Sequence, residues 1–139
     1  MQRTLLIASL LLCCSLGLSL VCADATEYPD LVGTWTGVSS GYHAEEDMFY
    51  NETLDMNFTM TIAEQQGRVL KGYTEVSEEY FQGNFTFSGI IDHDMTTVYV
   101  AEKGTGMDIF HIISPTEIEC IALDLDNSST AAIIYTKEE

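Results

Sequence analysis

Hydrophobic and polar residues alternate along much of this chain, most clearly between residues 54 and 62. The apolar set in that stretch is Leu54, Met56, Phe58, Met60 and Ile62, and the polar set is Asp55, Asn57, Thr59 and Thr61. An alternation of period two held over nine residues predicts a β-strand with one buried face. It also predicts that Asn57 lies on the outer face.

Seven other segments of similar length carry strand patterns, and short turns containing Gly, Pro, Asp or Ser separate them. These segments are residues 31–38, 69–76, 84–91, 96–102, 107–113, 117–123 and 129–137. No convincing helical pattern interrupts them. Short strands at regular spacing indicate a sandwich or a barrel. Sequential hairpins favour a meander, and closure removes exposed edges. We therefore expect an all-β fold, an eight-stranded antiparallel up-and-down barrel.

The longest connection, residues 39–52, is acidic but also carries much aromatic surface. It contains Gly41, an acidic run at 45–47, and the large side chains Tyr42, Met48, Phe49 and Tyr50. Two interpretations remain open: a flap that folds over one mouth of the barrel, or a wide hairpin tip. The aromatic content favours the flap.

The N-terminus has the pattern of a targeting segment. A short basic start is followed by an apolar run over residues 5–22 and a small-residue cleavage site at residues 23–25. We expect a signal peptide over residues 1–25 and one barrel domain over 26–139, secreted or displayed at the cell surface. An uncleaved segment could span a membrane, and Cys22 could carry a lipid. These alternatives are the only predicted membrane contact.

Composition narrows the function classes. Only Cys120 would remain after cleavage, so no intramolecular disulfide is expected in the domain. The whole chain has 22 acidic and 5 basic residues, a net charge of −17. Such a charge repels nucleic acid and anionic membrane surfaces, and it suits a solvated acidic surface.

All four asparagines of the chain begin an N-glycosylation sequon: Asn51, Asn57, Asn84 and Asn127. A sequon at every asparagine favours export through a glycosylating route. We therefore expect an extracellular glycoprotein.

A short motif near the start of the first predicted strand carries a family resemblance. Gly33-Thr34-Trp35 resembles the Gly-x-Trp signature of the calycin barrels, which include lipocalins and avidins, and Leu70-Lys71-Gly72 and Phe87-Ser88-Gly89 resemble the same pattern. The short length and the lack of a C-terminal helix are closer to avidin. In lipocalins a basic residue near the chain end packs over this Trp, which implies such a role for Lys137. The chain also resembles small exported barrel proteins of methanogenic archaea that have no assigned role.

The departures from avidin argue against biotin as the ligand. Avidins place an Asn two residues after the Trp and a Tyr two residues after the third-strand Gly, where this chain has Gly37 and Thr74. They also stack biotin between several tryptophans, whereas Trp35 is the only one here. A ureido group would therefore lack its partners, and an unpartnered buried polar group is costly.

The predicted inward residues define a candidate ligand site: Trp35, Met56, Phe58, Met60, Thr74, Phe85, Phe87 and His111. Trp35 is expected mainly as the floor of the core. An eight-stranded barrel is either filled by side chains or just wide enough for one small ligand. His111 shares a predicted face with Met107, Ile109 and Ile113, which indicates a hydrogen-bonded core histidine that could orient a ligand.

No pattern for catalysis, phosphate binding or zinc was found, so neither an enzyme nor a cofactor is predicted. Acidic turns at residues 92–94 and 124–127 could offer oxygen ligands to a hard cation, but ordinary turn chemistry explains them better. We therefore predict no metal site.

Two functions remain open. The first is an exported barrel that binds a small apolar or amphipathic ligand in its interior. The second is an extracellular or cell-surface interaction or structural module with a filled core. The sequence leaves the oligomeric state open.

Overall fold

The computed structural model describes residues 27–45, 47–50, 57–77, 82–104 and 106–139. The predicted signal peptide, Met56 and the Asn51 sequon lie outside these residues. The strands are β1 (Gly33–His43), β2 (Met48–Tyr50), β3 (Asn57–Gln66), β4 (Val69–Ser77), β5 (Gln82–Ile91), β6 (Thr97–Glu102), β7 (Gly106–Ser114), β8 (Glu117–Asp124) and β9 (Ser129–Lys137).

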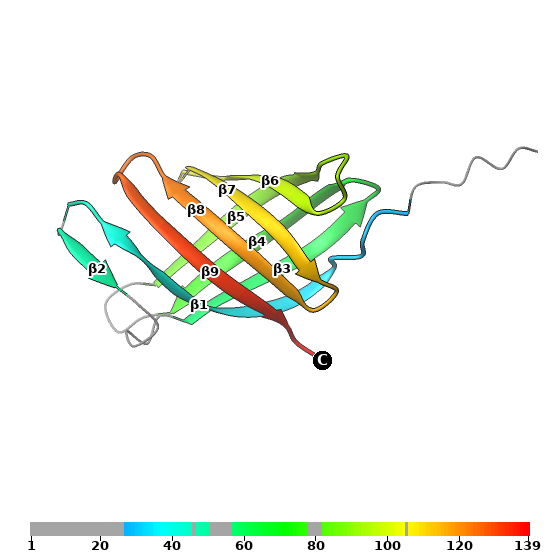
Figure 1. Ribbon diagram of the computed structural model, residues 1–139, viewed down its shortest axis with the longest axis horizontal. Helices are drawn as coiled ribbons and strands as arrows, with labels where there is room; N and C mark the ends of the chain where they lie inside the picture. Colours follow the sequence, from blue (N-terminus) through cyan, green and yellow to red (C-terminus); the bar gives the residue numbers. More distant parts are fainter. Residues whose placement is uncertain (1–26, 46, 51–56, 78–81, 105) are drawn as a thin grey trace, which may run out of the picture.

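Eight of these strands close into an antiparallel barrel, as the sequence predicts (Figure 1). Each strand from β3 to β9 pairs with the next along the chain, and β1 closes the ring by pairing with both β3 and β9. Among the described residues, closure leaves no long edge strand with unpaired backbone groups. Among the described residues there is no helix, and hence none that is long and apolar enough to cross a membrane.

The segment after Val38 extends the barrel wall instead of forming a separate loop. β1 continues to His43 because its residues 39–42 still pair with β9. On its other edge, Gly41 to His43 pair with β2, so β2 takes the place beside β1 that β3 leaves after Val38. The predicted flap is therefore wrong for the described residues. Backbone pairing along β1 makes this segment a hairpin that lengthens the wall.

The faces of most strands match the predicted alternation. On β3, Met60 and Ile62 are buried, while Asn57 is exposed. On β4, Leu70, Thr74 and Val76 point inward, and on β8 so do Ile118 and Cys120. A single apolar face fixes which side of each of these strands is buried.

The predicted face of β7 is wrong. His111 is exposed, as are Met107 and Ile113, whereas Asp108 and Phe110 are buried. The cause is a register shift at Ile113 between β7 and β8, where the pairs Ser114 with Glu117 and Ile112 with Ile118 flank one extra residue. Without that shift, His111 would face the inward Cys120, and a one-residue slip exchanges the two faces of a strand.

Candidate functional site

One end of the barrel is closed by Trp35 and Lys137. The indole is fully buried, and its Nε1 donates a hydrogen bond of 3.1 Å to the carbonyl of Leu31. Lys137 pairs with Trp35 in register, and its Nζ lies 5.2 Å from the ring centroid. This distance allows a cation–π interaction. The lysine that the calycin resemblance implies is therefore in contact with Trp35.

Gly33 and Gly37 make room for the neighbours of Trp35 more than for the indole itself. A Cβ atom at Gly33 would meet Lys137 Cε at 2.7 Å, and the φ of Gly33, +144°, disfavours other residues. A Cβ atom at Gly37 would meet side-chain atoms of Ile133 and Tyr135 at 2.8 Å. The two glycines therefore allow β9 side chains to pack over β1.

Buried apolar side chains pack the half of the interior next to Trp35. They are Leu31, Met60, Ile62, Leu70, Ile91, Val98, Val100 and Ile118, with Phe87 and Phe110 in edge-to-face contact at 6.2 Å. Trp35, Met60 and Phe87, predicted as ligand contacts, belong to this core. They do not line the interior cavity described below.

The other half of the interior contains a cavity of about 90 Å³. It lies toward the end of the barrel where β1 meets β2 and where the β6–β7 and β8–β9 turns are placed. Eleven of the described residues line it: Phe58, Thr74, Val76, Phe85, Glu102, Asp108, Phe110, Cys120, Ala122, Ile133 and Tyr135. Phe58, Thr74 and Phe85 are the predicted site residues that the structure brings together here.

Several lining residues were not identified from the sequence. The predicted inward face of β7, which carries His111, places Asp108 outside, and no sequence pattern points to Glu102. The signal that could have found Asp108 is the position of Phe110 two residues later, since both lie on one face of β7. Tyr135 follows from the same alternation on β9, where Ser129, Ile133 and Tyr135 are buried.

Asp108 is the most perturbed acidic group of the site. The residue is 7% exposed, and burial raises its pKa to about 7, with the nearby Glu102 charge and a hydrogen bond from Asp108 to Glu102 adding to the rise. Removal from water disfavours the charged carboxylate, and a second acid in the same site makes double ionisation costlier. Burial therefore keeps Asp108 protonated below about pH 7.

Two other titratable groups face the same cavity and stay neutral. Burial raises the pKa of the Cys120 thiol well above its usual range, and the acidic pair adds to the effect. Burial raises the pKa of Tyr135 in the same way. A thiol held in its protonated form is a poor nucleophile, so Cys120 acts as a small apolar wall residue.

The two acidic turns use their carboxylates internally, as turn chemistry predicts. Asp94 accepts hydrogen bonds from the backbone N–H groups of Thr96 and Thr97 and from Thr97 Oγ1, and these bonds lower its pKa to about 2. Asp124 accepts from the N–H groups of Asp126 and Asn127 and from Asn127 Nδ2. Within the described residues, no cluster of three or more potential ligands for a metal is found.

The three described sequon asparagines, Asn57, Asn84 and Asn127, all have exposed side chains. Asn57 and Asn84 lie at strand positions on the outer face. Glycan attachment at these sites stays a prediction.

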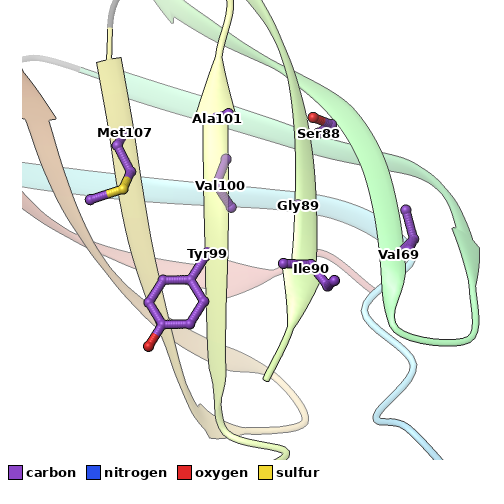
Figure 2. Close-up of a pocket in the computed structure, with 8 residues that line it drawn as sticks. All are labelled: Val69, Ser88, Gly89, Ile90, Tyr99, Val100, Ala101 and Met107. Carbon is purple, nitrogen blue, oxygen red and sulfur yellow. The ribbon is translucent and has the colours of Figure 1, made fainter. Parts of the chain in front are cut away.

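The outer wall of the barrel carries an apolar groove of about 410 Å³ across β4 to β7. Figure 2 shows its side chains, among which Tyr99 and Met107 lie on the neighbouring strands β6 and β7. Val69, Ile90, Tyr99 and Met107 are all exposed large apolar residues. They adjoin because Val69 pairs with Ile90, and Ile90 pairs with Tyr99.

Comparisons with known proteins identify the fold but no family. No family model matches the chain, and no curated protein matches it. Among solved structures, the chain is similar to a redesigned β-barrel, with a TM-score of 0.57 and 14% identity over 86% of this chain and 98% of that chain. At this identity the likeness concerns the fold alone. Kinship with calycins or archaeal barrel proteins stays a prediction, while the closed eight-stranded antiparallel barrel is confirmed.

Proposed function

We propose that this protein is an exported binding protein whose barrel interior takes a small amphipathic molecule. The observation that carries the proposal is the interior cavity of about 90 Å³, where polar groups from β4, β6, β7 and β9 meet in an otherwise apolar wall. Ligand sites typically combine apolar walls with a few convergent polar groups and perturbed pKa values. Asp108, Glu102, Thr74 and Tyr135 supply these groups.

The cavity volume limits the size of the ligand. An engineered apolar cavity of about 150 Å³ in another protein holds benzene. A cavity of about 90 Å³ therefore suits a molecule smaller than benzene, with only a few heavy atoms. Drug-sized ligands occupy pockets of about 300 Å³ or more, so they are too large for this cavity. The sequence left the size of the ligand open, and the cavity volume now limits it.

Methyl NMR tests the proposal directly. Ala122, Ile133 and Val76 carry methyl groups that line the cavity, whereas Ile62 lies in the packed half and Ile90 on the outer wall. A panel of small amphipathic molecules is expected to give saturable shifts at the cavity methyls alone. Trp35 emission is a poor reporter, since the indole lies in the closed end.

A matched pair of variants provides the control. Ala122→Leu adds volume inside the cavity and is expected to abolish the shifts. Ala132→Leu adds the same volume to the outer side of β9, because Ala132 pairs with the outward Ile121, and is expected to leave binding unchanged. Absence of saturable shifts across the panel in the parent protein would overturn the proposal.

A second candidate function is an extracellular interaction or structural module that works through its outer surface and binds no ligand inside the barrel. The exposed apolar groove on the outer wall favours it, since large apolar patches on soluble proteins often mark interaction sites. Tyr99→Ser would then reduce association in sedimentation experiments with native extracts while leaving the cavity unchanged. If the protein instead binds a small molecule in its interior, Tyr99→Ser should leave the affinity for that molecule unchanged.

A further inference from the structure

The hairpin of β1 and β2 carries exposed apolar side chains, which we call the aromatic tip (Tyr42, Met48 and Phe49). Phe49 is 82% exposed and Met48 is 44% exposed, and the rings of Tyr42 and Phe49 lie 4.7 Å apart across the two strands. The hydroxyl of Tyr42 donates a 2.8 Å hydrogen bond to Asp47, which holds this ring in place. The hairpin projects at one end of the barrel (Figure 1). It therefore presents preformed apolar surface that its own barrel does not bury.

The aromatic tip lies next to negative charge. The turn that joins β1 to β2 has the sequence Ala44-Glu45-Glu46-Asp47, and Glu45 and Asp47 are exposed. Most surfaces of a chain with 22 acidic and 5 basic residues would repel this turn. A surface of the same protein that accepts the tip must therefore be apolar and free of carboxylates.

The outer faces of β5, β6 and β7 form such a surface. The only acidic residues on these three strands are Glu102 and Asp108, and both line the interior cavity. The apolar groove of about 410 Å³ lies on this face and reaches Val69 on β4 (Figure 2). Benzene fits a cavity of about 150 Å³. The groove therefore has room for the ring of Phe49 together with a neighbouring side chain.

Three of the four basic residues in the described part of the chain adjoin this groove. Lys71 lines a second groove of about 400 Å³ that is continuous with the first. Arg68 lies directly before β4, and Lys103 lies directly after β6. Glu64 at 2.6 Å from Lys71 and Asp92 at 4.0 Å from Arg68 offset part of this positive charge. The cations that border the groove are still complementary to the acidic turn of the tip.

The aromatic tip cannot reach the groove of its own molecule. Around the ring of eight strands, four strand-to-strand steps separate β1 from β6 in either direction. The hairpin that continues β1 and the strands that form the groove therefore lie on opposite sides of the barrel. Only the groove of another molecule can receive the tip.

We propose that the aromatic tip of one molecule docks in the outer groove of a second copy of this chain, with Phe49 in the groove and the acidic turn beside its cations. Burial of exposed apolar side chains stabilises the contact, and charge complementarity selects the face. Because two different surfaces meet, each pair keeps one free tip and one free groove, so the contact repeats into open-ended chains of molecules. The contact lies outside the barrel, and its failure would leave the interior-binding proposal intact.

Sedimentation velocity of the full-length chain, as it is produced, tests the assembly. The sedimentation coefficient is expected to rise with protein concentration beyond the value of a dimer, because the contact does not close on itself. A plateau at the dimer would indicate a symmetric contact and would overturn the inference. A chain that stays monomeric up to about 1 mM would also overturn it and would leave the groove to a partner other than this chain.

Two matched pairs of variants identify the surfaces. Phe49→Ser is expected to weaken association at least about tenfold, because central aromatic residues often dominate a contact. Leu125→Ser removes an apolar residue that is 75% exposed in the β8–β9 turn and should leave association unchanged. Ala101→Glu places a carboxylate in the groove and should abolish association, whereas Ala132→Glu adds the same charge to the outer side of β9 and should change it little. Equal effects within either pair would overturn the inference.

A mixture of the two defective variants tests whether tip and groove bind each other. Phe49→Ser keeps its groove, and Ala101→Glu keeps its tip, so the mixture should form a dimer of one copy of each and nothing larger. Both positions are exposed, so the melting temperature of each variant should stay close to that of the parent protein. A mixture that stays monomeric although both variants are folded would overturn the inference.

Discussion

The ammonium of Lys137 lies over the ring of Trp35, with Nζ 5.2 Å from its centroid, and joins the last strand to the first at the closed end of the barrel. The two residues also pair in register between β1 and β9. The contact depends on Gly33, whose missing side chain leaves space for Lys137 Cε. One end of the molecule is therefore closed by a chain-end lysine, while the other end contains the cavity.

The first prediction concerns this contact. Lys137→Ala should lower the free energy of unfolding by about 1 kcal/mol, because it removes both the cation–π attraction and the packing of the lysine stem. Lys103→Ala, at an exposed turn position, removes the same charge and should change stability by less than about 0.5 kcal/mol. Urea unfolding followed by Trp35 fluorescence measures both. Equal effects of the two variants would mean that the contact with Trp35 adds nothing to the effect of losing one positive charge.

The second prediction concerns the pH dependence of stability. Asp108 has a pKa of about 7 in the folded protein, against about 3.9 in an unfolded chain. The folded state holds the Asp108 proton more tightly than the unfolded chain does. The stabilisation that this proton gives is therefore complete below about pH 4 and is lost as pH rises to about 7. A shift of about 3 pH units corresponds to at most about 4 kcal/mol. Asp108→Asn should therefore flatten the fall in stability between about pH 4 and 7.

Asp94→Asn is the control with the opposite sign. Hydrogen bonds from Thr97 and Thr96 lower the pKa of Asp94 to about 2, so its contribution is present above about pH 4 and is lost as pH falls through about 2. Urea unfolding at a series of pH values measures the stability of both variants, and about 0.5 M salt screens the surface repulsion. Asp108→Asn should change the pH dependence between about pH 4 and 7, and Asp94→Asn only below about pH 4. If the free energy of unfolding of Asp108→Asn falls with pH as steeply as that of the parent protein, Asp108 is not the cause of the fall.

The third prediction tests the assignment of faces on β7. Phe110→Ala should cost about 3–5 kcal/mol, because it removes a buried ring that packs edge to face on Phe87. His111→Ala, one residue later on the exposed face, should stay within about 0.5 kcal/mol. Thermal unfolding of the two variants measures the difference. A large loss in His111→Ala alone would restore the inward histidine that the sequence pattern suggested.

The contrast between β3 and β7 explains how far the sequence predicts this fold. On β3 one side is apolar and the other is Asn and Thr, so only one assignment of faces buries the apolar set. On β7 both sides carry large apolar residues, with Met107 and Ile109 outside and Phe110 inside. Alternation alone then cannot choose a side. The extra residue at Ile113 decides it, and a register shift depends on the paired strand.

The cavity was predicted only in part for a related reason. Phe58, Thr74 and Phe85 come from strands with one clear apolar face, and all three line the space. Asp108 and Glu102 are acidic residues of a chain with a net charge of −17, so composition alone suggests solvated surface positions. The burial of Asp108 follows from barrel closure, in which β1 pairs with both β3 and β9 and encloses the interior. Closure is a tertiary property that local patterns do not contain.

The fourth prediction is that stability rises with salt. Only four basic residues, Arg68, Lys71, Lys103 and Lys137, lie in the domain, against a large acidic excess over the chain. Like charges on a small domain repel each other, and salt at about 0.1 M screens them beyond about 10 Å. The melting temperature should therefore increase from about 0.02 to 0.5 M sodium chloride. A flat response would mean that charge repulsion contributes little to the stability of this barrel.

The fifth prediction concerns export and glycosylation. Mass spectrometry of native material should find an N-terminus near Asp24 or Thr26 and a glycan on at least Asn57 or Asn84, which are exposed on the outer wall. Asn127 should be modified less, because its Nδ2 donates a 2.7 Å hydrogen bond to Asp124 that a glycan would disturb. Asn57→Gln combined with Asn84→Gln should then remove most of the glycan mass, whereas Asn127→Gln should remove little. An unmodified chain that still begins with Met1 would contradict export by this route.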